Sequence, residues 1–68
     1  MIPIGKLIQE KLEEKGLPVA WLAEQTPCGR ANVYKIFNKQ SIDTEMLRRI
    51  SVILEFDFFQ YYSQQLKK

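Results

Sequence analysis

Three cationic side chains follow one another, with no acid between them, in the stretch from Arg30 to Gln40: Arg30, Lys35 and Lys39. The whole chain is nearly balanced, with 10 Lys and Arg against 8 Asp and Glu. The distribution of charge, more than its sum, decides where a protein attracts anions. The sequence therefore predicts one basic face on a nearly neutral molecule, a pattern typical of surfaces that bind nucleic-acid phosphates.

Covalent and metal chemistry have few candidate residues. The chain has no histidine and one cysteine, Cys28, so neither a zinc site nor a Cys–His nucleophile is expected. Glu13 and Glu14 are adjacent in a predicted helix, where such neighbours point in different directions; we interpret them as a solvated face. We expect a protein that is not an enzyme and that uses no metal, cofactor or small-molecule ligand.

The single cysteine also bears on the compartment, because it cannot form an internal disulfide and so favours a reducing environment. No apolar run approaches the roughly 20 residues that a membrane-spanning helix needs. The first residues lack the pattern of a signal peptide. These features predict a cytoplasmic protein without a membrane partner.

The elements that must position the cations are predicted to be short helices. Apolar residues at helical spacing indicate a first helix over 4–15. Gly16 is expected to end it in the left-handed conformation, which costs glycine little. Pro18 suits the first position of a second helix over 18–25, and Thr26-Pro27-Cys28-Gly29 is expected to break that helix.

A third helix is predicted over 30–37, with Val33, Ile36 and Phe37 as its inner stripe. Asn38 is expected to follow it in the left-handed conformation. This arrangement leaves the polar side chains of the helix pointing elsewhere: Arg30, Asn32, Lys35 and, beside them, Tyr34.

Two further helices are predicted from their caps. Asp43 is a favourable N-cap for a helix with an apolar side made of Met46, Leu47, Ile50, Ile53 and Leu54. Asp57 is expected to cap a last, aromatic helix over about 57–66. Since no segment alternates as a strand does, the expected fold is an all-α, compact five-helix bundle that forms one domain over residues 1–68.

Residues 18–37 place two short helices on either side of a three- to four-residue break, which is the layout of a helix-turn-helix. Ala23 is small where these helices would cross closely, and Val33 and Ile36 would anchor the second helix from beneath. A helix held in this way presents its N-terminal residues and outer face, and a B-DNA major groove is wide enough to admit one helix.

Leu17-Pro18-Val19-Ala20-Trp21-Leu22-Ala23-Glu24-Gln25, followed by Arg30-Ala31-Asn32-Val33-Tyr34-Lys35-Ile36-Phe37, resembles the lambda-repressor-like, Xre/Cro-type helix-turn-helix family. The similarity extends from Ile4 through Phe59. It implies a five-helix bundle in which the third helix contacts DNA. The base-contacting positions it implies are Arg30, Ala31, Asn32 and Lys35. The backbone-contacting positions are Tyr34, Asn38, Lys39, Gln40 and Ser41.

Under this resemblance, Arg30 would pair with guanine and Asn32 with adenine. The loop 38–41 and the N-terminus of the fourth helix would hold phosphate, and the loop is the favoured contact because the Asp43 carboxylate opposes an anion at the helix end. The sequence departs from the family at three places. Pro27 stands in the turn where glycine is usual, and Val19 stands where many relatives have a phosphate-binding glutamine. Leu12 and Phe37 replace a buried Arg–Glu pair, an exchange that can be neutral or stabilising.

Five aromatic residues fall between Phe56 and Tyr62, and one short helix cannot turn all of them inward. The surplus predicts a homodimer interface formed by Phe58, Phe59, Tyr61 and Tyr62. Two hypotheses follow for function. One is a sequence-specific double-stranded DNA-binding protein, a small transcriptional regulator. The other is a protein–protein interaction module on a helix-turn-helix-like scaffold, for example one component of a two-protein regulatory complex.

Overall fold

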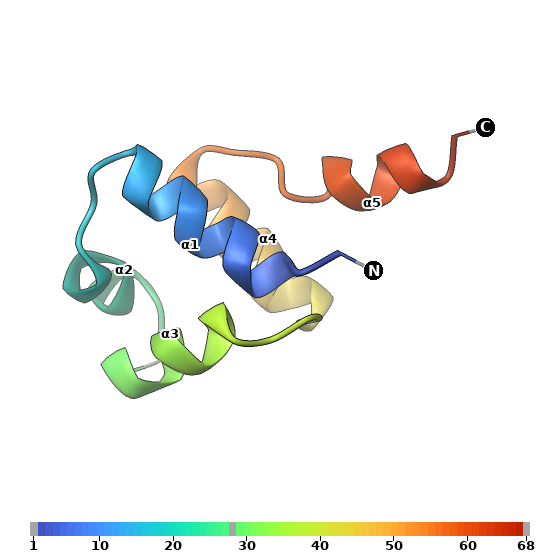
Figure 1. Ribbon diagram of the computed structural model, residues 1–68. Coiled ribbons are helices and arrows are strands. Elements are labelled where there is room, and N and C mark those ends of the chain that lie inside the picture. Colours follow the sequence, from blue (N-terminus) through green and yellow to red (C-terminus); the bar gives the residue numbers. More distant parts are fainter. Residues whose placement is uncertain (1, 28, 68) are drawn as a thin grey trace.

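The part of the chain that the structure describes forms five helices, and Figure 1 shows their arrangement. The computed structural model describes residues 2–27 and 29–67, and no strand occurs among them. The all-α expectation is confirmed. The helices are α1 (Ile4–Glu14), α2 (Val19–Gln25), α3 (Arg30–Phe37), α4 (Thr44–Leu54) and α5 (Gln60–Gln65).

The turn between α1 and α2 follows the prediction in part. Gly16 has φ +70°, the left-handed conformation expected of it. The helix before it ends at Glu14, one residue early, and Pro18 is the N-cap of α2 and not its first helical residue. Pro18 is extended (ψ 154°), and its carbonyl accepts the first helical hydrogen bonds, from the amides of Trp21 and Leu22. The break after α2 includes Cys28, which lies outside the described residues.

The end of α3 differs from the prediction. The helix has the predicted bounds, but Asn38 is right-handed (φ −94°, ψ −1°) and not left-handed. The tight turn continues for one more residue, because the amide of Lys39 donates to the carbonyl of Ile36 at 3.0 Å. The carbonyl of Lys39 then accepts from the amide of Gly5 at 3.0 Å. The start of α1 therefore fixes the backbone that follows α3.

The two ends of α4 are both closed by local hydrogen bonds. The Asp43 carboxylate accepts from the amide of Met46 at 2.8 Å, which confirms the predicted N-cap. At the other end Glu55 takes the left-handed conformation (φ 52°), while the amides of Glu55 and Phe56 donate to the carbonyls of Val52 and Ser51. This is the hydrogen-bond pattern of a Schellman turn, and it reverses the chain toward α5.

The last helix is shorter than predicted. It begins at Gln60, and Asp57 does not cap it; the Asp57 carboxylate accepts instead from the amide of Phe59 at 3.0 Å. The reason lies in Phe58, which is completely buried and whose amide donates to the Ser51 hydroxyl at 3.4 Å. The chain turns inward to bury this ring before the helix starts. Phe58 therefore cannot belong to a dimer interface, and that part of the prediction is wrong.

The hydrophobic core lies between α1, α2, α3 and α4. α1 and α2 both contact α3. No residue of α5 is buried, and Figure 1 shows this helix extending away from the other four, so the molecule is 39 Å long but only 20 and 18 Å across. The core residues are Ile4, Ile8, Leu12, Leu22, Val33, Ile36, Phe37, Leu47, Ile50, Leu54 and Phe58.

Candidate nucleic-acid interface

The outward side of α3 is the first part of the candidate site. Its inner stripe is buried as predicted, at Val33, Ile36 and Phe37. Successive helical residues are rotated by about 100°, so Ala31 and Lys35 point directly away from the core. The four predicted base-contacting residues are all exposed: Arg30, Ala31, Asn32 and Lys35.

Arg30 and Asn32 do not lie together. The same rotation of about 100° per residue places them on opposite edges of the exposed side of α3. Asn32 lies on the edge that faces α4, with Lys35. Arg30 lies on the other edge and is the first residue of the helix, with Tyr34 one turn further on. The site therefore has two edges, with the Ala31 position between them.

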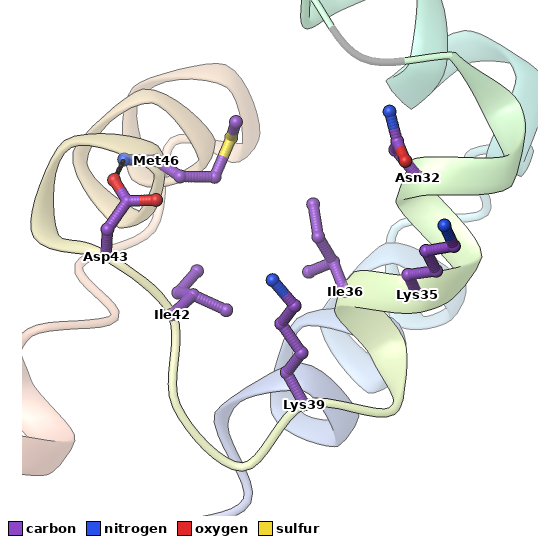
Figure 2. A pocket seen from close by; sticks show the side chains of 7 residues that line it. All are labelled: Asn32, Lys35, Ile36, Lys39, Ile42, Asp43 and Met46. Atoms are coloured by element: carbon purple, nitrogen blue, oxygen red, sulfur yellow. Dashed lines mark hydrogen bonds between the residues drawn. The ribbon is translucent and has the colours of Figure 1, made fainter.

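The α4-facing edge borders a recess of about 140 Å³ between α3, the loop after it and the first turn of α4. Figure 2 shows Asn32 and Lys35 on α3, and the ammonium group of Lys39 extending into the space between α3 and α4. Apolar side chains line the recess between the polar groups. Its lining residues are Asn32, Lys35, Ile36, Lys39, Ile42, Asp43 and Met46.

The cations of this surface are not paired with any acid that the structure describes. Among the described residues, no carboxylate lies within 4.0 Å of the charged groups of Arg30, Lys35 or Lys39. Asp43 is the acid that lines the recess, and it accepts the hydrogen bond from Met46 described above. An anion that approaches α3 therefore meets cations whose charge is not already compensated by an ion pair.

The cations of α4 are arranged differently. Arg48 donates two hydrogen bonds to Glu45, the shorter at 2.6 Å, and Arg49 donates a third at 3.2 Å. The hydrogen bond from Arg48 lowers the pKa of Glu45 below its usual value, and the same bond raises the pKa of Arg48. Both guanidinium groups are thus held by one carboxylate.

The N-terminus of α4 already carries negative side chains. The Asp43 carboxylate already accepts from an amide of the first turn, and Glu45 adds a second negative charge there. Negative side chains satisfy the positive end of a helix and repel a further anion. The phosphate-binding role predicted for this region therefore rests on the loop before it.

The five predicted backbone-contacting residues separate into distinct environments. The Tyr34 ring is 51% exposed and meets the Phe37 ring edge-on, with centroids 6.1 Å apart. The Asn38 side chain donates to the carbonyl of Tyr34 at 3.3 Å, so it helps to close α3. Lys39 lines the recess described above, whereas Gln40 and Ser41 line a different groove, beside α5.

Gly5 positions this surface and was not singled out by the sequence analysis. A Cβ atom at Gly5 would clash with the carbonyl oxygen of Ile36 and would lie 2.7 Å from that of Lys39. The absence of a side chain thus lets α1 contact the end of α3 and bind the Lys39 carbonyl. A glycine in the first turn of a helix, where it lowers helix propensity, is the signal that marks such a close approach.

Other kinds of site are not found in the described residues. No three acidic, cysteine or histidine side chains come together there as metal ligands would, and no helix of residues 2–27 and 29–67 is long and apolar enough to cross a bilayer. Comparison of the chain with protein-family models, curated proteins and solved structures gives no match.

Proposed function

We propose that this protein is a sequence-specific double-stranded DNA-binding regulator of transcription, with α2 and α3 forming a helix-turn-helix of the lambda-repressor-like (Xre/Cro) type. The proposal rests on one surface, which is the exposed side of α3 together with the loop that follows it. It presents Arg30, Asn32, Lys35 and Lys39 to solvent, and among residues 2–27 and 29–67 the three cations have no acidic partner. DNA supplies both the phosphates and the base edges that such groups bind.

The packing behind α3 supports this role. Leu22 of α2 and Val33 of α3 are each only 1% exposed, and both belong to the core. α1 adds a second contact to α3, fixed at Gly5. A DNA-contacting helix must keep its position when it enters a groove, because base contacts depend on geometry. The buried inner stripe of α3 provides that rigidity.

The two edges of α3 suggest a division of roles. Arg30 begins the helix, so its guanidinium can reach the floor of a major groove and pair with guanine. Asn32 on the other edge would pair with adenine, and the small Ala31 between them would pack on a thymine methyl group. Lys35 would contact a base or a phosphate. Lys39 would bind phosphate, with Tyr34, Gln40 and Ser41 as flanking backbone contacts.

A salt titration of binding to a random-sequence duplex tests the proposal. Each phosphate neutralised by a cation contributes about 0.9 to the slope of log affinity against log salt, so Lys35→Ala and Lys39→Ala should each reduce the slope by about 1. Lys15→Ala is the matched control, because Lys15 is an exposed cation at the end of α1 and far along the chain from α3. No binding at low salt would refute the proposal.

Sequence preference is tested by selection from a random duplex pool. The parent chain should select a consensus, and Arg30→Ala and Asn32→Ala should each relax one base pair of it, at a cost of about 1–3 kcal/mol. Both residues are exposed, so the variants should fold. An unchanged consensus in both variants would reject the assignment of these residues as base contacts.

A second function, protein–protein interaction on the same scaffold, is favoured by one observation. The segment 58–66 contains no charged side chain, and depletion of charge is typical of the centre of protein interfaces. The salt titration separates the two functions, because a module that binds only protein would show no salt-dependent affinity for duplex DNA.

A further inference from the structure

The recess between α3 and α4 has the size of a small-molecule site. Its walls come from α3, from the loop after it and from the first turn of α4. The side chains of Ile36, Ile42 and Met46 form the apolar part of its lining. Its volume is about 140 Å³, and apolar cavities of about 150 Å³ hold one molecule of benzene. The recess therefore has room for one ring of that size.

The charges around the recess favour an anion. Two cations, Lys35 and Lys39, line it together with one acid, Asp43, so its lining carries one positive charge in excess. The Asp43 carboxylate is already used by the amide of Met46, at 2.8 Å. In the described part of the chain no carboxylate lies within 4.0 Å of either ammonium group, and Figure 2 shows that of Lys39 extending into the space between the helices.

We propose that this recess binds a small carboxylate with an apolar body of about the size of one six-membered ring. Sites for small molecules combine apolar walls with a few polar groups that orient the ligand. The ring would lie against Ile36, Ile42 and Met46, and the carboxylate would accept a hydrogen bond from the Lys39 ammonium group. Such a ligand was not expected from the sequence, because the recess forms only where the two helices and the loop come together.

The same ligand would compete with DNA. Asn32 and Lys35 line the recess and also belong to the proposed base-contacting residues. A carboxylate in the recess would compensate the charge of Lys39 and occupy the space beside Asn32, so the surface would attract phosphate less strongly. The ligand site depends on the recess alone, whereas this competition rests on the proposed function.

Titration of the labelled full chain with benzoate, followed by nuclear magnetic resonance without DNA, tests the site. Benzoate should bind with a dissociation constant on the order of 1 mM, with the largest amide shifts between Ile36 and Met46. Acetate has the charge without the ring, and benzylammonium has the ring with the opposite charge. Both should bind at least about tenfold more weakly. The absence of saturable shifts with benzoate, or equal binding of either control compound, would overturn the proposal.

Lys39→Ala removes the ammonium group that would hold the carboxylate. It should raise the dissociation constant of benzoate at least about fivefold, and it should fold because the Lys39 side chain is exposed. Lys15→Ala is the matched control, since Lys15 is an exposed cation that does not line the recess. Equal weakening in the two variants would assign binding to net charge and would also overturn the proposal.

Competition is measured by the affinity for a random-sequence duplex in benzoate and in acetate at the same ionic strength. Benzoate at ten times its dissociation constant should lower the apparent DNA affinity about tenfold relative to acetate. Equal affinity in the two salts would refute the competition. A chain that binds benzoate but no duplex DNA would refute the proposed function and leave the ligand site intact, and a chain that binds DNA but not benzoate would do the reverse.

Discussion

Two neighbouring parts of this protein each expose a pair of cations, and the pairs differ in their surroundings. Lys35 and Lys39, on and just after α3, have no carboxylate of the described residues within 4.0 Å. Arg48 and Arg49, on α4, share the carboxylate of Glu45. The number of cations on a helix therefore does not identify an anion-binding face. The positions of the acids around them decide it.

The comparison also explains why the nearly balanced charge of the chain is compatible with a basic face. An acid that forms a local ion pair neutralises a cation outside α3, as Glu45 does on α4 and as Glu14 does with Lys11 on α1. The stretch from Arg30 to Ile42 contains no acid at all. The positive potential is therefore expected to be concentrated at α3 and the loop after it.

We expect the largest loss of stability and of DNA affinity from Gly5→Ala. This change breaks the backbone contact between α1 and the end of α3 that positions the cations. The new methyl group would overlap the carbonyl of Ile36, so α1 and α3 must separate, at a cost of about 1–3 kcal/mol in the free energy of unfolding. Thermal and urea unfolding measure that cost. Affinity for DNA should fall as well, because Lys39 moves with the backbone.

Gly16→Ala is the control for this change. Its Cβ meets no atom within 4 Å, so the cost is only that of the left-handed conformation, about 1 kcal/mol. Affinity for DNA should stay at the level of the parent once the variant is folded. Equal losses of affinity in the two glycine variants would contradict the positioning role of Gly5.

The next largest effect is expected on the salt dependence of DNA binding, when one or the other pair of cations is removed. The double variant Lys35→Ala/Lys39→Ala should reduce the salt slope of DNA binding by about 2. The double variant Arg48→Ala/Arg49→Ala removes the same amount of charge and should change the slope by much less, because Glu45 already compensates these guanidinium groups. Filter binding or fluorescence anisotropy at several salt concentrations measures both. Equal changes of slope would mean that net charge alone drives binding.

A smaller effect is expected from Glu45→Gln, which releases the α4 cations. Arg48 and Arg49 then become available, so non-specific affinity for duplex DNA should rise a few-fold at low salt and the salt slope should steepen. Glu10→Gln serves as the control, since Glu10 is an exposed acid of α1 without an ion pair within 4.0 Å in the described structure. A rise of the same size in both variants would assign the effect to net charge.

The smallest effect is expected in the pH dependence of the stability that the ion pair between Glu45 and Arg48 contributes. Hydrogen bonding to Arg48 lowers the pKa of Glu45 below its usual 4.5 in the folded protein. The stabilisation is therefore present above pH 4.5 and is lost as the pH falls through the lowered pKa. Because Glu45 is fully exposed, the contribution is small. In denaturant unfolding, the difference between parent and Glu45→Gln should shrink as the pH falls well below 4.5, and a constant difference would contradict the pairing.

Several local features of this fold could be predicted because they depend on few residues, whereas the conformation of Asn38 and the cap at Asp57 could not. The bounds of α3 follow from Val33, Ile36 and Phe37, the cap of α4 follows from Asp43, and the left-handed turn follows from Gly16. The site is predicted less completely. The helical periodicity predicts that Arg30, Asn32 and Lys35 are all exposed. That Asn32 and Lys35 line the recess while Arg30 does not depends on where α4 packs relative to α3.

Features that depend on distant contacts were not predictable in this way. Gly5 matters because α1 approaches the end of α3, a contact between residues far apart in the chain. Phe58 resembles its aromatic neighbours in sequence, yet the turn at Asp57 carries it into the core and shortens α5. The capture of two arginines by Glu45 likewise depends on side-chain geometry along α4.

Nuclear magnetic resonance can locate the surface of the protein that binds duplex DNA, which we propose is the exposed side of α3. A short duplex is titrated into the labelled chain at low salt, and the amide shifts are followed residue by residue. We expect the largest shifts to cluster between Arg30 and Ile42, with little change at Arg48, Arg49 and Val52. Shifts confined to α4 or α5, or no shifts at all, would contradict this expectation.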